Sequence, residues 1–391
     1  MALQPAAGTR DLNPREVDGN RWLCDQLGQV YRLWGYAEVA PPTVERLETL
    51  EAGGGINDQE LVRLAADEPL GLRPEMTASI ARAAGTRMAQ RPRPLRLWSS
   101  GLVFRSRQSD TGQHRLEEQL QSGVELLGSD AEAGSAADAE LLRLLLACLR
   151  QLGIESAQQP RLLLGHHGVL SALLDQVPTE QRTSVRQALI SFDPLALKQL
   201  DLPAHQRQGL EQLMRLRGQP EAVLYQLEQL LGPSRQLDSL AETLKVVAPI
   251  AQSQQVQIQL DPTFQPHYDL YDGLVLKLVC QGPEAPLEIA SGGRYDALVR
   301  RFGGSGSGLG FSFDVEAIRS LLGTDGTAPN RPGCTLVSYR SITELPAALE
   351  LLESLHRAGT PAELLHGPCS SQAEAEEQAR IRGCSATRWL D

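Results

Sequence analysis

The most constraining feature of the chain is a long stretch of helical sequence, from about Val169 to Ala251, that separates two regions rich in strand patterns. The stretch is rich in leucine and glutamine, and prolines and glycines divide its helical segments. Helix and strand patterns alternate on both sides of it. We interpret the stretch as a helical domain inserted into a fold that mixes helices and strands.

The region before this stretch opens with one helix and a short strand. Amphipathic spacing predicts a helix over about Val17 to Leu33, which Gly35-Tyr36 then stops. An extended segment follows from Ala37 to Ala40. The proline pair at residues 41–42 suits the end or the edge of a strand, because proline is poorly tolerated in a helix interior.

A second helix is predicted from about Ala136 to Leu152. Leucines at helical spacing form an apolar stripe along it, and Gly153 can end it. Ser135 and Asp138 have the spacing of a capping box, which predicts that the helix begins after Ser135. A short apolar strand, Arg161 to Leu164, follows this helix.

Strand patterns return after the helical stretch and then give way to a smaller domain. The predicted strands are Val256 to Leu260, Gly273 to Cys280, Glu288 to Ala290 and Gly308 to Phe313. Residues 323–332 carry glycine and proline and have the composition of a linker. Residues 333–391 alternate strand and helix, with helix caps expected at Ser341 and Ser371. This βαβαβ pattern predicts a small parallel sheet.

The composition is that of an ordinary globular protein and disfavours two classes of partner. Of the 391 residues, 41% are hydrophobic, which suffices for two or three domains with their own cores. The net charge of −11 argues against nucleic-acid binding, because proteins that hold a phosphate backbone usually present a basic face. The sequence shows no apolar run of membrane-spanning length and no basic-then-apolar signal pattern at its start, so we expect a cytoplasmic protein.

Three features that could indicate a ligand site have simpler interpretations. The 6 cysteines lie in apolar runs without a CxxC pair, which is typical of buried free thiols in a reducing compartment. His166 and His167 are adjacent, so on a strand they would point to opposite faces and could not easily share a metal ion. The glycines between Gly303 and Gly310 lack the Lys-Ser/Thr pair of a phosphate-binding loop and suit a turn before a strand. We therefore expect neither a metal nor a cofactor.

Four segments carry charged or hydroxyl residues and glycine inside otherwise apolar strand sequence. They are residues 72–77 (Leu-Arg-Pro-Glu-Met-Thr), 103–105 (Val-Phe-Arg), 121–125 (Gln-Ser-Gly-Val-Glu) and 291–296 (Ser-Gly-Gly-Arg-Tyr-Asp). Such side chains are costly to bury unless they are paired or bound to a ligand. Their presence in one chain indicates a buried polar site.

In order and content these segments resemble the catalytic domain of histidyl-tRNA synthetase, a class II aminoacyl-tRNA synthetase. The resemblance covers about residues 5–128 and 255–322. It implies an α+β fold with an antiparallel sheet and helices over residues 1–322, in which the helical insertion occupies about residues 169–251. The small α/β domain, residues 333–391, is similar to a shortened anticodon-binding domain.

The resemblance also implies a histidine pocket. Glu75 and Thr77 match a carboxylate and a hydroxyl that meet the amino group of histidine, with Met76 in place of the family's glycine. Tyr295 matches a tyrosine near the imidazole ring. The other matched positions that line the site are Arg115, Gln121, Glu125, Asp269 and Tyr271. Carboxylates that face an ammonium group, with tyrosine and glutamine beside ring nitrogens, make a credible pocket for histidine.

Three departures from the synthetase pattern fall on positions that serve the ATP chemistry. Arg105 remains in the second class motif, but Arg107 stands where the family has glutamate. Ala317 stands where the third motif has an arginine on ATP, and Pro266 where an arginine acts on the activated carboxylate. The loss of one such group from a preorganised site costs on the order of 10² to 10³ in rate. The pattern therefore implies a site that keeps histidine and has lost the synthetase reaction.

The chain is similar in all these respects to the regulatory subunits of ATP phosphoribosyltransferase. This resemblance implies that the chain is not itself an enzyme and that it pairs with a short catalytic subunit in the first step of histidine biosynthesis. It also implies L-histidine as effector and a homodimer within a hetero-oligomer. Two alternatives stay open at this point: a divergent histidyl-tRNA synthetase, and a synthetase-like partner of another complex.

Overall fold

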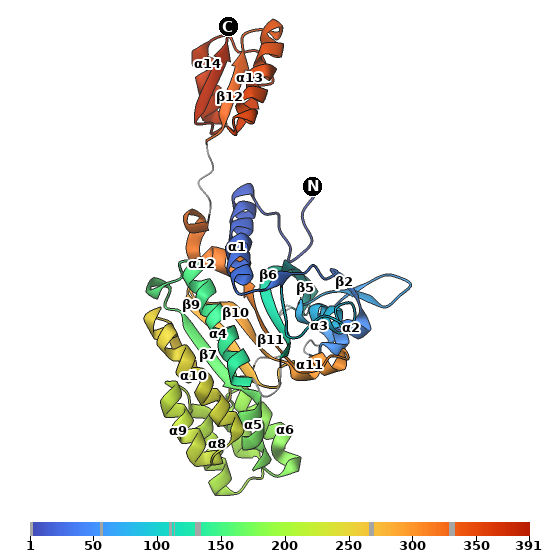
Figure 1. Cartoon of the computed structure of the whole chain (residues 1–391), viewed down its shortest axis with the longest axis vertical. Coiled ribbons are helices and arrows are strands. Elements are labelled where there is room, and N and C mark those ends of the chain that lie inside the picture. The colour runs from blue at the N-terminus through green and yellow to red at the C-terminus, as the bar shows by residue number, and fades with distance from the viewer. Residues whose placement is uncertain are drawn as a thin grey trace. The chain divides into compact units, whose positions relative to one another are not determined.

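An eight-stranded sheet organises the larger of the two units into which the chain divides, Met1–Thr327 and Ala328–Asp391 (Figure 1). The computed structural model describes residues 3–54, 58–108, 112, 114–129, 134–265, 270–327 and 333–391. The strands of the sheet are β1 (Ala37–Glu38), β5 (Leu95–Gln108), β6 (His114–Ser129), β7 (Arg161–His166), β8 (Gln257–Leu260), β9 (Leu274–Gln281), β10 (Pro286–Arg294) and β11 (Ser307–Asp314). Their spatial order is β1-β5-β6-β11-β10-β9-β7-β8.

The strands between the two edges of this sheet pair antiparallel, and only β1 and β8 run parallel to their described neighbours. This confirms the predicted α+β fold with an antiparallel sheet. The centre of the sheet joins distant parts of the chain, since Ser122 on β6 pairs with Phe313 on β11. β10 is longer than the predicted strand from Glu288 to Ala290, because its glycines after Ala290 stay in the sheet and pair with both β9 and β11.

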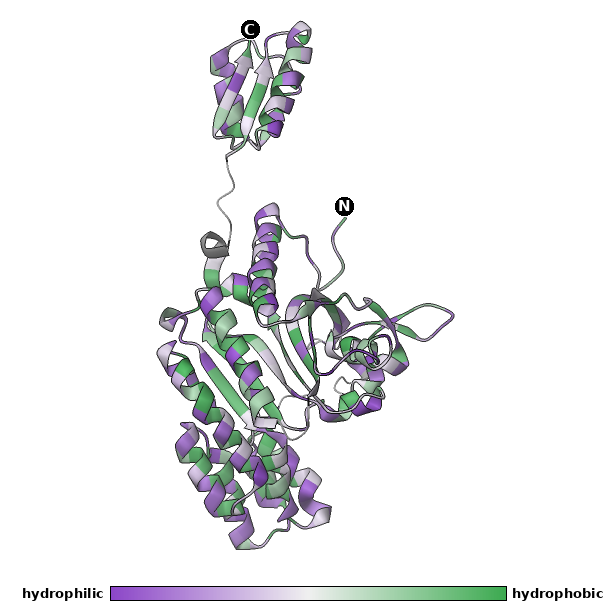
Figure 2. Cartoon of the chain, viewed as in Figure 1, coloured by the Kyte–Doolittle hydropathy of each residue, from purple (hydrophilic) through white to green (hydrophobic). Residues whose placement is uncertain are grey.

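Helices pack on both faces of the large sheet. They are α1 (Pro14–Leu33), α3 (Thr77–Gly85), α4 (Gly134–Gln151), α11 (Asp296–Arg301) and α12 (Val315–Thr327). α1, α4 and α12 supply the core on one face, and α3 and α11 supply the core on the other. Side chains alternate along a strand, so Trp98 joins the first core and its neighbour Leu97 joins the second. Figure 2 shows apolar residues along the strands between these layers.

A small antiparallel sheet precedes the long β5–β6 hairpin. It contains β2 (Val44–Arg46), β3 (Val62–Leu64) and β4 (Leu70–Leu72) in the order β2-β4-β3, and α2 (Leu47–Ala52) follows β2. Arg73, directly after β4, is buried and donates to the carbonyls of Leu102 (2.9 Å) and Pro41 (2.7 Å). These bonds fix the segment that leads into α3.

The helical insertion lies between β7 and β8, as predicted. Its helices are α5 (His167–Asp175), α6 (Arg182–Ile190), α7 (Pro194–Gln199), α8 (Ala204–Arg215), α9 (Pro220–Leu231) and α10 (Arg235–Ser253). Their buried leucines join the core that α1 and α4 form, and α10 packs along α4. The insertion therefore belongs to the same compact unit as the sheet.

The predicted helix from Val17 to Leu33 is confirmed, but it begins earlier, at Pro14. Asn13 and Glu16 form a capping box there, in which the Asn13 side chain accepts from the backbone N–H of Glu16 at 3.0 Å. Gly35 adopts a φ of 80°, which suits the turn after the helix.

The predicted capping box at Ser135 and Asp138 is wrong. α4 already begins at Gly134, and the Ser135 hydroxyl donates to Glu242 on α10 at 3.0 Å. Asp138 instead accepts from Arg294 on β10 at 2.7 Å in a largely buried ion pair. Asp138 therefore pairs with Arg294, which is distant in sequence, and not with Ser135 at the start of its own helix.

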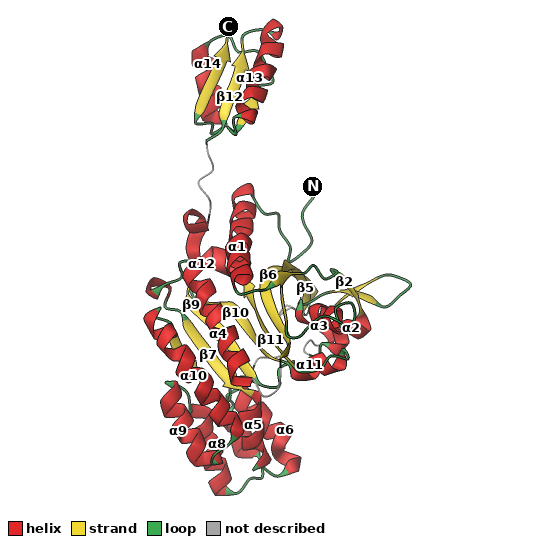
Figure 3. Cartoon of the chain, in the orientation of Figure 1, coloured by secondary structure: helices red, strands yellow, loops and turns green. Residues whose placement is uncertain are grey.

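The smaller unit is a three-stranded parallel sheet with helices, as the βαβαβ pattern predicted (Figure 3). Its elements are β12 (Thr335–Tyr339), α13 (Leu345–Arg357), β13 (Ala362–Leu364), α14 (Gln372–Ile381) and β14 (Ala386–Leu390), with the sheet order β13-β12-β14. The Ser341 and Ser371 side chains cap the turns that open the two helical segments, which confirms both predicted caps.

Two glycine-bearing segments end elements of the larger unit. Gly303 and Gly306 adopt φ of 75° and 83° in the turn between α11 and β11, which confirms a turn in place of a phosphate-binding loop. Gly323 interrupts α12 with φ of 73°, at the start of the predicted linker, and residues 328–332 lie outside the described part of the chain.

Among the helices of the described residues, none is both long and apolar enough to cross a bilayer.

Candidate functional site

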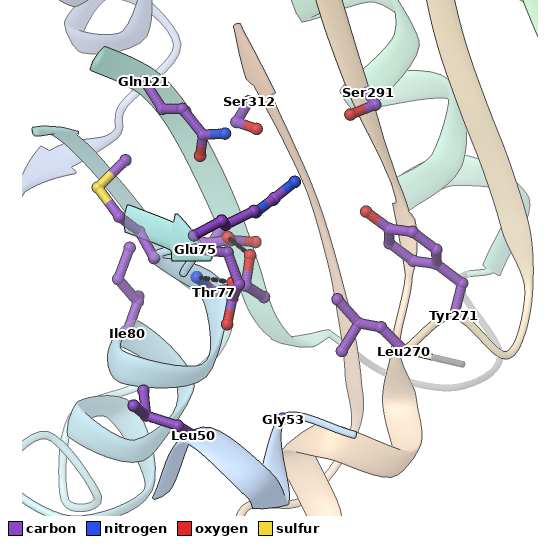
Figure 4. Close-up of a pocket in the computed structure, with 14 residues that line it drawn as sticks. Leu50, Gly53, Glu75, Thr77, Ile80, Gln121, Leu270, Tyr271, Ser291 and Ser312 are labelled. Carbon is purple, nitrogen blue, oxygen red and sulfur yellow. Dashed lines mark hydrogen bonds between the residues drawn. The ribbon is translucent and has the colours of Figure 1, made fainter. Parts of the chain in front are cut away.

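A cavity on the α3 face of the large sheet collects most of the polar residues that the sequence analysis singled out (Figure 4). Gln121, Gly123 and Glu125 of β6 line its floor. Because side chains alternate along a strand, Val124 faces the other core instead. The neighbouring strands β11 and β10 continue this floor, and the segment at Leu270-Tyr271 also lines the cavity.

Glu75 is held at the N-terminus of α3. One of its carboxylate oxygens accepts from the backbone N–H of Ala78 at 2.9 Å, and the other accepts from the backbone N–H of Thr77. Free N–H groups at a helix N-terminus favour such a carboxylate. Burial nevertheless raises the pKa of Glu75, an effect that these hydrogen bonds oppose. Glu75 is thus both a structural cap of α3 and a wall of the cavity.

Glu125 lies beside it on the floor and is 5% exposed. The Thr77 hydroxyl donates to one carboxylate oxygen at 2.6 Å, and the Tyr295 hydroxyl donates to the other. Burial raises the pKa of Glu125 to about 8, although both hydroxyl groups favour the ionised form. The negative charge of Glu75 raises this pKa further. The charge of Glu75 therefore disfavours ionisation of Glu125, and a cation between the two carboxylates would relieve that cost.

Gly310 gives Glu125 the room to lie on the floor. Gly310 on β11 is the cross-strand partner of Glu125 on β6. A Cβ at this position would collide with the Glu125 carboxylate and with the carbonyl of Val124. Neither neighbour can move freely, because one is fixed by two hydroxyl groups and the other is sheet backbone.

A chain of three polar side chains closes the other end of the floor. Gln121 is 9% exposed and donates to Gln119 at 2.9 Å, and Gln119 donates to Asp314 at 2.5 Å. The second oxygen of Asp314 accepts from the backbone N–H of Ala317 at 2.9 Å, at the start of α12. The sequence analysis missed Gln119 as a site residue. The alternation along β6, which puts Gln119 on the same face as Gln121, could have found it.

The strands beside β6 and the segment at Tyr271 present hydroxyl groups. Tyr271 lines the cavity with its ring standing against β10 (Figure 4). Ser291 on β10 and Ser312 on β11 also line it, and the two residues are paired in register. The sequence analysis did not single out Ser312.

The structure brings six of the predicted site residues to the cavity region. They are Glu75, Thr77, Gln121, Glu125, Tyr271 and Tyr295. Arg105 also lines the cavity and donates from Nε to the carbonyl of Pro74 at 3.1 Å. Arg115 does not line it: it is an exposed residue of β6, paired in register with Arg107 on β5. Asp269 lies outside the described residues.

The two adjacent histidines lie at the junction of β7 and α5. His167 Nδ1 is 2.6 Å from the side-chain nitrogen of Gln265. His166 is the last residue of β7, and burial lowers its pKa to about 4. Within the described part of the chain, neither ring belongs to a group of three metal-ligating side chains.

Comparison with known proteins agrees with this architecture. The histidyl-tRNA synthetase family model matches residues 8–318. A solved ATP phosphoribosyltransferase regulatory subunit/histidyl-tRNA synthetase from Bacillus halodurans is similar with a TM-score of 0.82 at 25% identity, over 100% of this chain and 99% of that one. Histidyl-tRNA synthetase from Nostoc sp. PCC 7120 shares the fold, with a TM-score of 0.77 at 20% identity over 98% of this chain and 90% of that one.

Curated relatives decide the family. The ATP phosphoribosyltransferase regulatory subunit of Synechococcus sp. (strain RCC307) is 51% identical over 395 residues, which cover 100% of both chains. That of Prochlorococcus marinus (strain MIT 9303) is 49% identical, again over 100% of both. The chain belongs to the ATP phosphoribosyltransferase regulatory subunit family. The cavity of this regulatory-subunit family member lies within the residues that the synthetase model matches.

Two of the three positions at which this regulatory-subunit family member departs from the synthetase pattern make structural contacts. Arg107 is exposed and pairs with Glu117 across the hairpin at 2.6 Å. Ala317 packs against the core of α1 and α4. Pro266 lies outside the described residues.

Proposed function

We propose that the chain is a non-catalytic regulatory subunit of ATP phosphoribosyltransferase and that L-histidine binds in the cavity on the α3 face. The observation that carries the proposal is the pair of carboxylates, Glu75 and Glu125, fixed by hydrogen bonds around one cavity. Two carboxylates in one low-dielectric space favour a positively charged ligand. The ammonium group of an amino acid supplies that charge.

The rest of the cavity suits the remaining groups of histidine. Arg105 can face the ligand's carboxylate, because a guanidinium and a carboxylate form strong charge-assisted hydrogen bonds. Gln121 and Tyr271 can exchange hydrogen bonds with the two imidazole nitrogens. Tyr295 already donates to Glu125, so we assign it the positioning of that carboxylate.

A synthetase reaction needs preorganised positive charge around the ATP phosphates. The position of the family's third-motif arginine is Ala317 here, and it packs as a core residue. Arg107 stands in place of a glutamate and forms a surface ion pair. Because each missing group costs on the order of 10² to 10³ in rate, the chain should bind histidine without activating it.

The test of this part is histidine- and ATP-dependent exchange of labelled pyrophosphate. We expect no exchange above background from the purified chain. Robust exchange that depends on histidine would instead assign the chain to the divergent synthetases.

The names of the relatives support a catalytic partner, which we propose is the short form of the ATP phosphoribosyltransferase catalytic subunit. The first step of histidine biosynthesis would then be carried out by a hetero-oligomer that contains a homodimer of this chain. Co-expression should give one co-eluting complex whose activity exceeds that of the catalytic subunit alone and falls on addition of histidine. Separate elution at micromolar concentrations, with an unchanged rate, would contradict the proposal.

A further inference from the structure

Three metal-ligating side chains converge in the smaller unit, at the edge of the sheet where its strands begin. Cys334 directly precedes β12, Glu363 lies in β13, and Cys384 shortly precedes β14. One ligand atom from each side chain lies within 4.8 Å of the other two. The strands are parallel neighbours in the order β13-β12-β14, so the topology itself brings the three residues together.

This convergence is specific to one place in the molecule. Among the described residues, no other group of three histidine, cysteine, aspartate or glutamate side chains comes within the same distance of one another. All three residues are partly exposed, so an ion can reach them from solvent. None of them contributes to the cavity on the larger unit.

The spacing is close to that of a tetrahedral zinc site. Zinc–sulfur bonds of about 2.3 Å place two thiolate sulfurs about 3.8 Å apart in a tetrahedron. The ligand atoms here lie at most 4.8 Å apart. Rotation of partly exposed side chains can close that difference without movement of the backbone.

Neighbouring contacts hold the three ligands. Arg382 donates to one oxygen of Glu363 at 3.3 Å, and the Cys384 thiol also hydrogen-bonds to the Glu363 carboxylate, so an ion would take the place of the thiol proton. The backbone N–H of Ser385 donates to the carbonyl of Cys334 at 2.9 Å and keeps the two cysteine-bearing segments side by side. Outer contacts of this kind orient metal ligands and tune their affinity.

We propose that Cys334, Glu363 and Cys384 form a zinc site. Two thiolates and a carboxylate suit Zn²⁺, and three protein ligands leave a fourth position for water or an exchangeable ligand. Each thiol loses its proton on binding, so one Zn²⁺ displaces two protons. The ion would join all three strands of a sheet whose unit is too short to bury a large core.

The test is metal binding to the full chain, stripped of metal and kept reduced, with Co²⁺ as the optical probe and Zn²⁺ as the competitor. We expect about one Co²⁺ per chain, a thiolate-to-cobalt charge-transfer band, and displacement by Zn²⁺. Loss of an outer contact weakens metal binding by about 10- to 100-fold. Cys334→Ser and Cys384→Ser remove ligands, so each should weaken binding by more than about 100-fold.

Two further variants make the result independent of folding defects. Glu363→Gln keeps the shape of a partly exposed side chain and should weaken binding by at least about 10-fold. Cys24→Ser changes a partly buried thiol of the larger unit and should bind metal like the unchanged chain. Circular dichroism confirms that each variant is folded.

Two outcomes would overturn the zinc site. One is the absence of the charge-transfer band, or a band that survives in both Cys334→Ser and Cys384→Ser. The other is a reduced chain that binds no metal but exchanges with glutathione disulfide to form a Cys334–Cys384 disulfide and two glutathione thiols. That result would make the cluster a dithiol pair.

Discussion

The two ends of the cavity floor use hydrogen bonds in opposite ways. At one end, Thr77 and Tyr295 both donate to Glu125, so both hydrogen bonds favour the ionised form of one carboxylate. At the other end, Gln121, Gln119 and Asp314 bond to one another in a chain that closes on the backbone of α12. The comparison teaches that polar side chains of one sheet can be prepared for a ligand or satisfied among themselves.

Gly310→Ala should have the largest effect on the Glu125 end of the floor, both on stability and on histidine binding. The added methyl group collides with the Glu125 carboxylate and with sheet backbone, and overpacking of this kind costs about 3 kcal/mol. We expect unfolding of the larger unit at lower urea concentration and loss of measurable histidine binding. Gly209→Ala is the matched control, because a Cβ at Gly209 in α8 meets nothing within 4 Å. A Gly310→Ala chain as stable as the control would contradict the packing argument.

Glu125→Gln should remove the charge and keep the shape. The Thr77 and Tyr295 hydroxyl groups can turn to accept from the new amide, because a hydroxyl both donates and accepts. A charge-assisted hydrogen bond contributes about 1.5 to 3 kcal/mol, so histidine affinity should fall by roughly 10- to 150-fold in calorimetry. Unchanged affinity would place the ligand elsewhere.

Glu75→Gln should destabilise the chain more than Glu125→Gln, although both variants change the same end of the floor. Its partners are the backbone N–H groups of Thr77 and Ala78, which cannot accept a hydrogen bond. The amide nitrogen would face one of them, so we expect a similar loss of histidine affinity together with a less stable chain. The thermal melting temperature separates the two variants.

Glu125 should contribute to the pH dependence of histidine binding, beside the ligand's own imidazole and amino groups. Burial raises the pKa of Glu125 to about 8 in the empty cavity, and an ammonium group beside it favours the ionised form. Below about pH 8, histidine binding should therefore release a proton from Glu125. Histidine affinity should rise by up to about tenfold for each unit that the pH increases. The raised pKa of Glu125 stabilises the folded protein at low pH, and this contribution is lost as pH rises from the ordinary glutamate pKa of 4.5 through about 8. Calorimetry near pH 7.5 in buffers of different ionisation enthalpy measures the released proton, and Glu125→Gln should lower the number of protons released.

Gln119→Ala should have the smallest effect on the ligand. It breaks the chain between Gln121 and Asp314, which costs about 1 kcal/mol of unfolding free energy. Histidine affinity should change by less than about 3-fold, because Gln119 does not itself line the cavity. An affinity loss as large as that of Glu125→Gln would show that the two ends act as one site.

Sequence reasoning predicted the elements whose patterns are long and periodic. The helix that ends at Leu33, the helical insertion and the parallel sheet after residue 333 are all present, because a sustained apolar period reports burial directly. The role of Asp138 was predicted wrongly, since its partner Arg294 lies on a strand far along the chain. Local spacing holds no information about such a partner.

The same limit applies to the cavity. Glu75, Glu125 and Tyr295 could be matched by motif, and the fold brings them together. Asp314 reaches Gln119 only through the register of β6 against β11, which no local pattern specifies. Arg115 matched by spacing, yet it lies on the exposed part of the hairpin.

The pairing of β6 with β11 also determines when the cavity can form during synthesis of the chain. As the chain leaves the ribosome, the β5–β6 hairpin is made first, and the whole helical insertion follows before β11 can cover its open edge. Contacts of such long sequence separation form slowly, and an unpaired strand edge favours aggregation until it is covered. A ligand that binds only after β11 has paired with β6 stabilises the complete sheet and not the partly folded chain. Histidine present during synthesis should therefore raise the yield of folded chain.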